Sequence, residues 1–448
     1  MLFYDKYDIW LGNLLNNKPS VNLTNSYGRK NKLRFRIAGN YNSKRISIYQ
    51  HIILTAFDTK NKNSGFFRKR LDDKGDPELL TMGAYSYADP TGIIEQKASD
   101  TNIYIIQRSS ASYFPNYFWT SDFKTFTPVT NVYPEYRYNW LTSELISYKT
   151  MDGILSQGIL YKPQNFDPNK KYPIIFHYYE KKSDRLNVYL KPGYAINEIN
   201  IPWFVSKGYL VFTPDIYYKI GHAGESAFNS VVSAAKYLSK FPWIDTLKMG
   251  LQGHSFGGYE TNYIITHSNI FCAAISAAGI SDMISSSGGL SHGGISRQPL
   301  YESGQNRMGV LVWRRSDLYF ENSPIFNVDK VSTPLLIMHN KNDDAVPFAQ
   351  GVELFTALRR LGKKVWMLQY DEERHTLHGK KQILDYTIRM TQFFDHYLKE
   401  APAPKWMTRG IPVSMKGVDD GLDLDTEIKT PGKGLLIIEQ PKNVVKKK

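Results

Sequence analysis

The feature that most constrains the fold is a change of hydrophobic pattern near Tyr148. Beyond that residue, short apolar runs alternate with stretches in which apolar residues recur at helical spacing. This alternation is typical of a parallel sheet flanked by helices. The run Pro173–Tyr179 is almost wholly apolar or aromatic, as a strand buried on both faces should be. Residues 148–402 are therefore predicted to form an α/β domain with a mostly parallel sheet.

The strands predicted for this domain are apolar runs bounded by polar or glycine-containing turns: Ile154–Tyr161, Pro173–Tyr179, Tyr209–Pro214, Met249–Gly253, Cys272–Ala278, Leu335–His339 and Val365–Tyr370. The predicted helices are Glu225–Ser239, a helix after Ser255, Phe348–Leu361 and 380–399. Gly362 follows the third helix as a C-terminal cap.

Residues 1–147 have a different pattern and are predicted to be all-β. Runs rich in Tyr, Ile, Phe and Val are separated by turn clusters, and apolar residues seldom recur at helical spacing. Such strands favour meandering antiparallel sheets, as in sandwiches or propeller blades. The runs are Leu33–Ile37, Ile46–Phe57, Ile103–Gln107 and Tyr113–Thr120.

Residues 403–448 combine Gly, Pro and charge with the short apolar run Leu435–Ile438. They are predicted to form a peripheral basic tail. The formal net charge of the whole chain is +14, but it is spread along the sequence and is dense only at Lys446–Lys448. A nucleic-acid partner is therefore not expected.

Composition excludes several classes of protein. Hydrophobic residues are 42% and charged residues 22% of the chain, which is an ordinary globular composition. No apolar run approaches the roughly 18 residues of a membrane-spanning helix. Cys272, the single cysteine, excludes a disulfide framework and a zinc site of several thiolates. No metal-ligand spacing, P-loop or dinucleotide fingerprint is present, so neither a metal nor a cofactor is expected.

The N-terminal sequence lacks the basic start, apolar stretch and small-residue cleavage site of a signal peptide. An N-terminus lost from a longer chain would also remove such a peptide, so the sequence leaves the cellular compartment open. It leaves the oligomeric state open as well, a homo-oligomer included.

The segment Gly253-His254-Ser255-Phe256-Gly257 fits the pattern G-x-S-x-G. In this motif a serine sits on a sharp strand-to-helix turn and projects its hydroxyl above the sheet. A side chain at either flanking glycine would clash with neighbouring elements. Gly258 adds a small residue where the helix should pack on the sheet. Ser255 is therefore the candidate nucleophile.

A serine hydroxyl needs a base, and the base needs an orienting acid. In α/β hydrolases these follow in the order Ser, Asp, His. Asp343 follows the strand ending at His339, and His375 follows the strand ending at Tyr370, so both are expected at the carboxyl edge of the sheet. Asp344 is an alternative acid.

His378 is an alternative base, but it lies further from the strand than His375. The reaction also needs donors for the oxyanion. One candidate is the backbone N–H of Phe256, the residue after the nucleophile. The second is a tyrosine at the end of the strand Pro173–Tyr179, where Tyr178 and Tyr179 both stand.

These residues resemble the prolyl oligopeptidase family of serine peptidases over about residues 135–402. The resemblance rests on several segments together: Tyr172-Pro173-Ile174-Ile175-Phe176, Ser206-Lys207-Gly208-Tyr209, Gly253-His254-Ser255-Phe256-Gly257-Gly258-Tyr259, Ser323-Pro324, Thr333-Pro334-Leu335-Leu336-Ile337-Met338-His339, Asp343-Asp344-Ala345-Val346-Pro347 and Leu361-Gly362-Lys363.

The resemblance implies an α/β-hydrolase domain that cleaves peptide bonds in short peptides through an acyl-enzyme. It implies Ser255 as nucleophile, Asp343 rather than Asp344 as the triad acid, and His375 as the base. It also implies Tyr179 as the oxyanion donor that ends the Tyr-Pro-led strand. An esterase on the same fold, or a binding protein with an idle triad, are the alternatives.

The chain departs from the family pattern in its N-terminal region. About 147 residues precede the hydrolase domain, too few for a propeller of about 4–8 four-stranded blades. The all-β region resembles part of a propeller. Either the chain is a fragment of a longer one, which is the favoured interpretation, or its N-terminal domain is reduced.

Substrate specificity does not follow from the resemblance. No glutamate pair for a free amino terminus is recognisable. Ala345 stands where the family often has a polar or basic residue, and Ile284–Gly289 is mostly serine and glycine. A preference for proline is therefore not implied.

Overall fold

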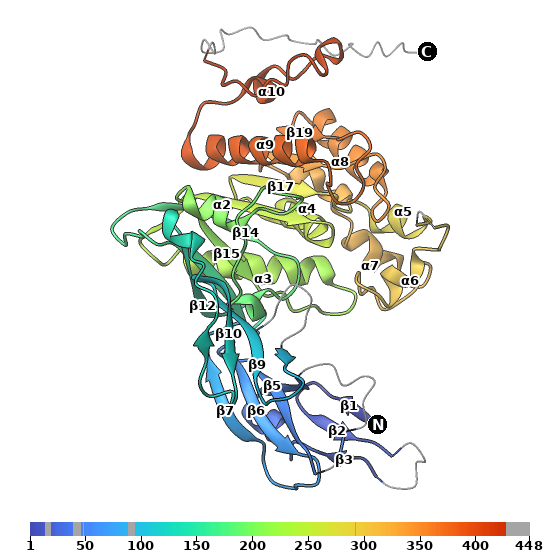
Figure 1. Cartoon of the computed structure of the whole chain (residues 1–448). Coiled ribbons are helices and arrows are strands. Elements are labelled where there is room, and N and C mark those ends of the chain that lie inside the picture. The colour runs from blue at the N-terminus through green and yellow to red at the C-terminus, as the bar shows by residue number, and fades with distance from the viewer. Residues whose placement is uncertain (14–18, 39–45, 48, 88–94, 292, 427–448) are drawn as a thin grey trace, which may run out of the picture.

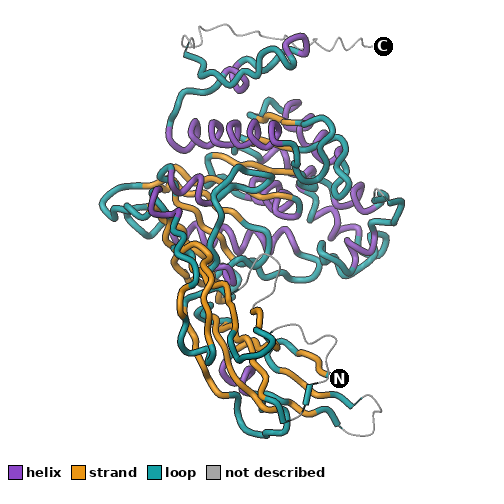
Figure 2. Tube along the Cα trace, in the orientation of Figure 1, coloured by secondary structure: helices purple, strands orange, loops and turns teal. Residues whose placement is uncertain are grey.

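The computed structural model describes residues 1–13, 19–38, 46–47, 49–87, 95–291 and 293–426 (Figure 1). The apolar run Leu435–Ile438 and the lysines 446–448 lie outside the described residues. Antiparallel strands form an N-terminal arm, and a mixed sheet with helices around it forms the body, as the colouring of Figure 2 shows.

Within the described residues, the body contains an eight-stranded sheet in the order β12-β13-β15-β14-β16-β17-β18-β19. Strands β14 to β19 are all parallel, whereas β12 and β13 are antiparallel to their neighbours. The predicted fold class, an α/β hydrolase with a mostly parallel sheet, is confirmed. The strands are β12 (Leu141–Lys149), β13 (Leu155–Pro163), β14 (Tyr172–His177), β15 (Leu210–Pro214), β16 (Ile244–His254), β17 (Ala273–Ala277), β18 (Leu335–Met338) and β19 (Val365–Leu368).

The edge strand β12 is absent from the predicted strands of this domain. It pairs with β13 along its whole length, from Leu141 opposite Pro163 to Lys149 opposite Leu155. The domain boundary predicted between residues 147 and 148 therefore falls inside a strand of the sheet. A half-exposed antiparallel edge strand alternates polar and apolar residues, so its pattern matches that of the preceding all-β region.

Helices cover both faces of the sheet and bury two hydrophobic clusters. Successive strand residues alternate between the faces: Ile174 and Phe176 belong to one cluster, and Ile175 belongs to the other. The first cluster lies under α3 (Ala223–Leu238), α4 (Phe256–His267) and α8 (Phe348–Arg360), and the second under α2 (Ile201–Ser206), α9 (Lys380–Lys399) and α10 (Lys405–Thr408).

Short helices complete the body: α5 (Met283–Ser287), α6 (Gln298–Glu302) and α7 (Ser316–Glu321) between β17 and β18, and the 3-10 turns η2 (Ser183–Arg185), η3 (Pro324–Lys330) and η4 (Val413–Met415).

The N-terminal arm is built of meandering antiparallel sheets, as the sequence predicts. Each sheet joins strands that are consecutive in the chain. They are β1 (Leu2–Tyr4), β2 (Ile9–Leu11) and β3 (Val21–Asn22); β4 (Leu33–Ile37), β5 (His51–Asp58), β6 (Ser64–Arg70) and β7 (Glu78–Gly83); and β8 (Glu95–Lys97), β9 (Tyr104–Ser110), β10 (Tyr113–Thr120) and β11 (Thr127–Pro128). The helices of this region are α1 (Tyr27–Asn31) and the 3-10 turn η1 (Pro134–Arg137).

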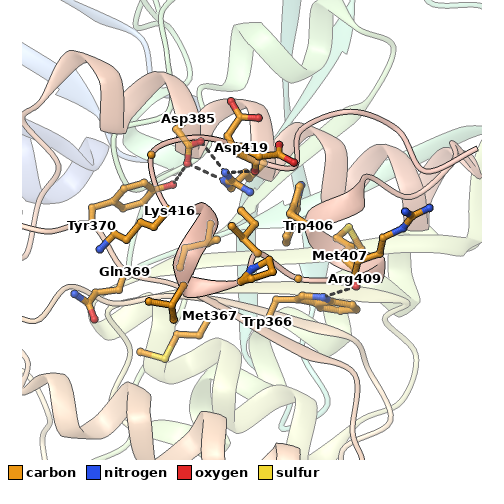
Figure 3. A pocket seen from close by; sticks show the side chains of 18 of the residues that line it. Trp366, Met367, Gln369, Tyr370, Asp385, Trp406, Met407, Arg409, Lys416 and Asp419 are labelled. Atoms are coloured by element: carbon orange, nitrogen blue, oxygen red, sulfur yellow. Dashed lines mark hydrogen bonds and ion pairs between the residues drawn. The ribbon is translucent and has the colours of Figure 1, made fainter.

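The described part of the C-terminal region, residues 403–426, packs on the body. Trp406 and Met407 are buried, and Trp366 of β19 donates its indole N–H to Met407 O at 2.9 Å (Figure 3). The Trp406 indole N–H bonds to Gln392 of α9 at 2.8 Å. These residues and α8 surround a cavity of about 810 Å³ beside the edge strand β19.

Among the described helices, none combines the length and the apolar character that crossing a lipid bilayer requires.

Candidate active site

The predicted site residues meet at one edge of the sheet. Ser255 follows β16, Asp343 follows β18, His375 follows β19 and Tyr179 follows β14. Because these strands are parallel, their carboxyl ends all lie at the same edge, where sites of α/β proteins form.

Ser255 occupies a strained turn between β16 and α4. Its backbone has φ 59° and ψ −118°, which places a non-glycine residue at positive φ. Such a conformation costs of order 1–3 kcal/mol and is held by the surrounding structure. Here the Ser255 N–H donates to Ala277 O at 2.8 Å, and the Ser255 carbonyl accepts from Tyr259 N at 3.0 Å. This is the geometry of a nucleophile elbow.

The glycines of the motif are required by close backbone approach. A Cβ on Gly253 would lie 2.0 Å from Gly257 O, and a Cβ on Gly257 would lie 2.7 Å from Tyr178 O. A Cβ on Gly258 would lie 2.6 Å from Ala277 O, where α4 crosses the end of β17. The predicted clashes at these glycines are confirmed.

Asp343 and His375 form a close pair. His375 Nδ1 lies 2.9 Å from Asp343 Oδ2 and 3.0 Å from Oδ1. The Asp343 side chain is fully buried, and its Oδ1 also accepts the N–H groups of Ala345 and Val346 at 2.9 and 2.8 Å. These bonds fix the position of the Asp343 carboxylate. His375 contacts it through Nδ1, so the other ring nitrogen, Nε2, takes no part in this pair.

The two alternative residues lie elsewhere. Asp344 is about one-third exposed, and its carboxylate faces Arg374 at 3.5 Å. The His378 side chain is 76% exposed and lies 3.8 Å from Glu373. The structure thus brings together Asp343 and His375, and not Asp344 or His378.

A second histidine contacts the buried carboxylate. His339 Nε2 lies 3.4 Å from Asp343 Oδ2 and 3.1 Å from Val346 O. Burial by itself raises the pKa of the Asp343 carboxyl, but hydrogen bonds from His339 and His375 outweigh burial and hold this pKa well below its usual range. Asp343 is therefore ionised at neutral pH and can orient and stabilise a protonated His375.

Ser255 follows directly on a residue that contacts the candidate base. Its neighbour His254 packs against His375, with ring centroids 4.6 Å apart. Ser255 is half-buried, and its hydroxyl makes no hydrogen bond with the described residues. Bonds between nucleophile and base are often long before a substrate is bound.

The two tyrosines after β14 point to different places. Tyr178 is fully buried, and its hydroxyl bonds to Thr261 Oγ1 of α4 at 2.8 Å. Tyr179 is half-buried beside Gly257, and its hydroxyl oxygen accepts Gln305 Nε2 at 2.7 Å. The Tyr179 O–H proton is then available to a further acceptor. Phe256 begins α4, so its N–H has no carbonyl partner within the helix.

A buried acid that the sequence analysis did not single out lies behind Tyr179. Glu260 is fully buried on α4 and hydrogen-bonds to the hydroxyl of Tyr218, whose oxygen also lies 2.8 Å from Tyr179 O. Burial raises the pKa of Glu260 well above its usual range, so it is neutral at pH 7. In the sequence, burial of Glu260 could have been suspected only from its position on the predicted helix after Ser255.

Two buried asparagines hold the loop that carries His375. Asn197 Nδ2 donates to His375 O at 2.7 Å and lies 2.8 Å from His254 Nε2, and its Oδ1 accepts Leu377 N at 3.0 Å. Asn340 Nδ2 donates to Arg374 O at 2.8 Å. No local pattern identifies such residues, because their partners are distant in sequence.

Among the described residues, no group of His, Cys, Asp and Glu is arranged to hold a metal ion.

Residues 197–401 match the profile of the prolyl oligopeptidase family. Among curated proteins, the uncharacterized peptidase YuxL of Bacillus subtilis is 28% identical over 271 residues, which are 57% of this chain and 39% of the relative. Human dipeptidyl peptidase 8 is 28% identical over 275 residues, which are 57% of this chain and 28% of that protein. The chain thus spans well under half the length of these relatives.

Solved structures share the fold. An acylaminoacyl peptidase of Pyrococcus horikoshii superposes with a TM-score of 0.63 at 19% identity, covering 89% of this chain and 61% of that one. A puromycin hydrolase superposes with a TM-score of 0.64 at 12% identity, covering 88% and 58%. The sequence match over the part of the chain that contains the serine elbow and the Asp–His pair agrees with the resemblance found in the sequence. Residues 197–401 are thus similar to the prolyl oligopeptidase family of peptidases.

Proposed function

We propose that the chain is a serine peptidase that hydrolyses peptide bonds in short peptides through an acyl-enzyme. The observation that carries the proposal is Ser255 at a strained elbow on the same sheet edge as the buried Asp343–His375 pair. Peptides as substrates are supported by the family and by relatives whose names are dipeptidyl and acylaminoacyl peptidases.

The chemistry assigns one role to each group. Ser255 Oγ attacks the carbonyl carbon while His375 Nε2 takes its proton, and Asp343 stabilises the resulting imidazolium. The Phe256 N–H and the Tyr179 hydroxyl donate to the oxyanion. When the C–N bond breaks, His375 gives the proton to the leaving amine, and water then releases the acid from Ser255. Removing one oxyanion donor typically costs about 10²–10³ in turnover.

A fluorophosphonate probe, which phosphonylates activated serines with loss of fluoride, tests this proposal on the purified full chain. We expect the wild type to be labelled and Ser255→Ala to be unlabelled with an unchanged circular dichroism spectrum. Labelling that persists in Ser255→Ala would contradict the assignment of Ser255 as the nucleophile. A folded wild type that is not labelled would favour an idle triad. Paired amide and ester substrates then separate a peptidase from an esterase.

Neighbouring aspartates provide a matched control for the triad acid. Asp343→Asn keeps the side-chain shape but holds His375 in the wrong tautomer, so turnover should fall by about 10⁴-fold. Asp344→Asn removes the same charge from a more exposed position and should stay near the wild-type rate. Equal effects of the two substitutions would contradict the role of Asp343.

A further inference from the structure

A second cavity with charged walls lies at the same sheet edge as Ser255, near the ends of β13, β14 and β15. Its volume is about 360 Å³. Its walls come from β13, β14, β15, the start of α2 and the loop between β14 and α2. Its lining includes the charged side chains of Lys182, Arg185, Lys191 and Glu198 together with His177.

The deep wall of the cavity is a compact cluster around one lysine. Lys182 Nζ lies 2.7 Å from His177 Nε2 and 3.1 Å from Glu198 Oε2, and its side chain is only 13% exposed. Burial lowers the pKa of Lys182, and burial followed by the nearby lysine lowers the pKa of the 2% exposed His177. His177 is therefore neutral at pH 7 and accepts a hydrogen bond from the ammonium. The third N–H of Lys182 has no partner among the described residues.

The rest of the lining carries uncompensated positive charge. Arg185 and Lys191 are exposed at the rim, and within the described residues neither side chain forms an ion pair or a hydrogen bond. The nearby Asp215 is not available to them, because its carboxylate accepts the N–H groups of Lys182 and Ser183 and the Ser183 hydroxyl. Glu198 is thus the one carboxylate facing three cationic side chains in the described lining.

We propose that this cavity is a binding site for a small oxyanion, a carboxylate or a phosphate group. Lys182 contacts the anion from the deep wall, and Arg185 and Lys191 contact it from the rim. Guanidinium and ammonium groups match the oxygens of such anions. At about 30 Å³ per water molecule, the cavity holds a carboxylate or phosphate group together with several waters.

The cavity is connected to the candidate active site by main-chain contacts next to Glu198. Ile199 N donates to Gln252 Oε1 at 3.2 Å, and Gln252 Nε2 donates to Asn197 O at 3.0 Å. Asn197 in turn bonds to the carbonyl of His375. An anion held at Lys182 therefore lies beside the segment that fixes the His375 loop, whether it is a free ion or the carboxylate that ends a bound peptide.

Isothermal titration calorimetry of the full chain with inorganic phosphate and with acetate, at low ionic strength, tests the site without requiring activity. We expect saturable binding that weakens with added salt. Arg185→Gln should weaken it by about fivefold or more, since it removes a charge-assisted contact. Glu198→Gln should strengthen it, because it removes the competing carboxylate.

Arg314→Gln is the matched control, since Arg314 is exposed and does not line the cavity. Absence of saturable binding by wild type, or equal binding by Arg185→Gln and Arg314→Gln, would overturn the proposal.

A second experiment identifies the source of the anion, and it rests on the proposed function. Ser255→Ala is titrated with a short peptide as its free acid and as its C-terminal amide. Tighter binding of the acid, lost on adding Arg185→Gln, assigns the site to the peptide carboxylate. If the two peptides bind equally and the wild type still binds phosphate saturably, the site is assigned to a free anion. The phosphate titration tests the anion site even if Ser255 proves to be catalytically inactive.

Discussion

At the scale of single residues, the candidate site depends on buried groups whose charge is set by their surroundings. Asp343 is buried but ionised, because two histidines and two backbone N–H groups point at it. Glu260 is equally buried but has only the Tyr218 hydroxyl, and its Oε2 has no partner among the described residues. Two buried carboxyl groups of the site therefore differ in charge: Asp343 is ionised, whereas burial favours the neutral form of Glu260.

Glu260 makes stability depend on pH. Its folded-state pKa lies above the unfolded value of about 4.3, so the unfolded state loses its proton first as pH rises. This contribution to the free energy of unfolding therefore falls as pH rises above the unfolded pKa, with a slope of up to about 1.4 kcal/mol per unit. Glu260→Gln cannot ionise, so we expect urea unfolding of this variant to lose less stability than wild type as pH rises.

The exposed Glu321 supplies the control, and Glu321→Gln should keep the wild-type pH dependence. A Glu260→Gln variant with the same pH dependence as wild type would show that Glu260 is ionised in the folded protein.

At the scale of elements, the position of Ser255 depends on how closely α4 crosses the sheet. The close contacts at Gly258 involve backbone atoms of Ala277 and Gly279, which cannot rotate away as a side chain can. The helix and β17 would have to separate to admit a methyl group.

Gly258→Ala should therefore destabilise the protein by about 1–3 kcal/mol, the usual cost of overpacking a well-packed core. Because the shift moves α4 against the elbow, labelling of Ser255 by a fluorophosphonate should slow as well. Gly293→Ala is the control, since a Cβ there meets no atom within 4 Å. Equal urea midpoints for the two variants would mean that the crossing is looser than the structure describes.

At the scale of the whole molecule, polar contacts join the N-terminal arm to the body in addition to the packing of Phe114 on Tyr189. The turn between β5 and β6 carries Lys62, whose side chain is 4% exposed and pairs with Asp184 at 3.2 Å. Nearby, Asn187 Nδ2 donates to Lys62 O at 2.9 Å, and Gln157 Nε2 donates to Lys60 O at 3.1 Å. Within the arm, Lys62 Nζ also donates to Thr59 O at 2.9 Å.

Asp184→Asn should weaken this attachment, because it leaves the buried Lys62 ammonium without its carboxylate. Asp184 is 43% exposed, so we expect a loss of about 1 kcal/mol rather than the larger cost of breaking a fully buried pair. Faster proteolytic cleavage of the arm should accompany it. Asp317→Asn, which breaks an exposed pair with Arg315, is the control. The prediction is wrong if both variants unfold at the same urea concentration.

The sequence by itself predicted the strands β13 to β19, the turn at Ser255 and the candidate acid and base that follow it. These depend on local pattern: apolar runs report strands buried on both faces, and G-x-S-x-G reports a turn that only small residues allow. It did not assign β12 to this domain, because the strand alternates polar and apolar residues as the strands of the N-terminal arm do.

Only the tertiary structure decided which side chains meet. It placed Asn197 against His375, which lies 178 residues further along the chain, and it gathered Lys182, Arg185 and Lys191 around one cavity. It also put Glu260 behind Tyr179 through a tyrosine from another segment. The physical reason is that periodicity reports how each segment is buried, whereas a polar contact depends on a partner that sequence spacing does not specify.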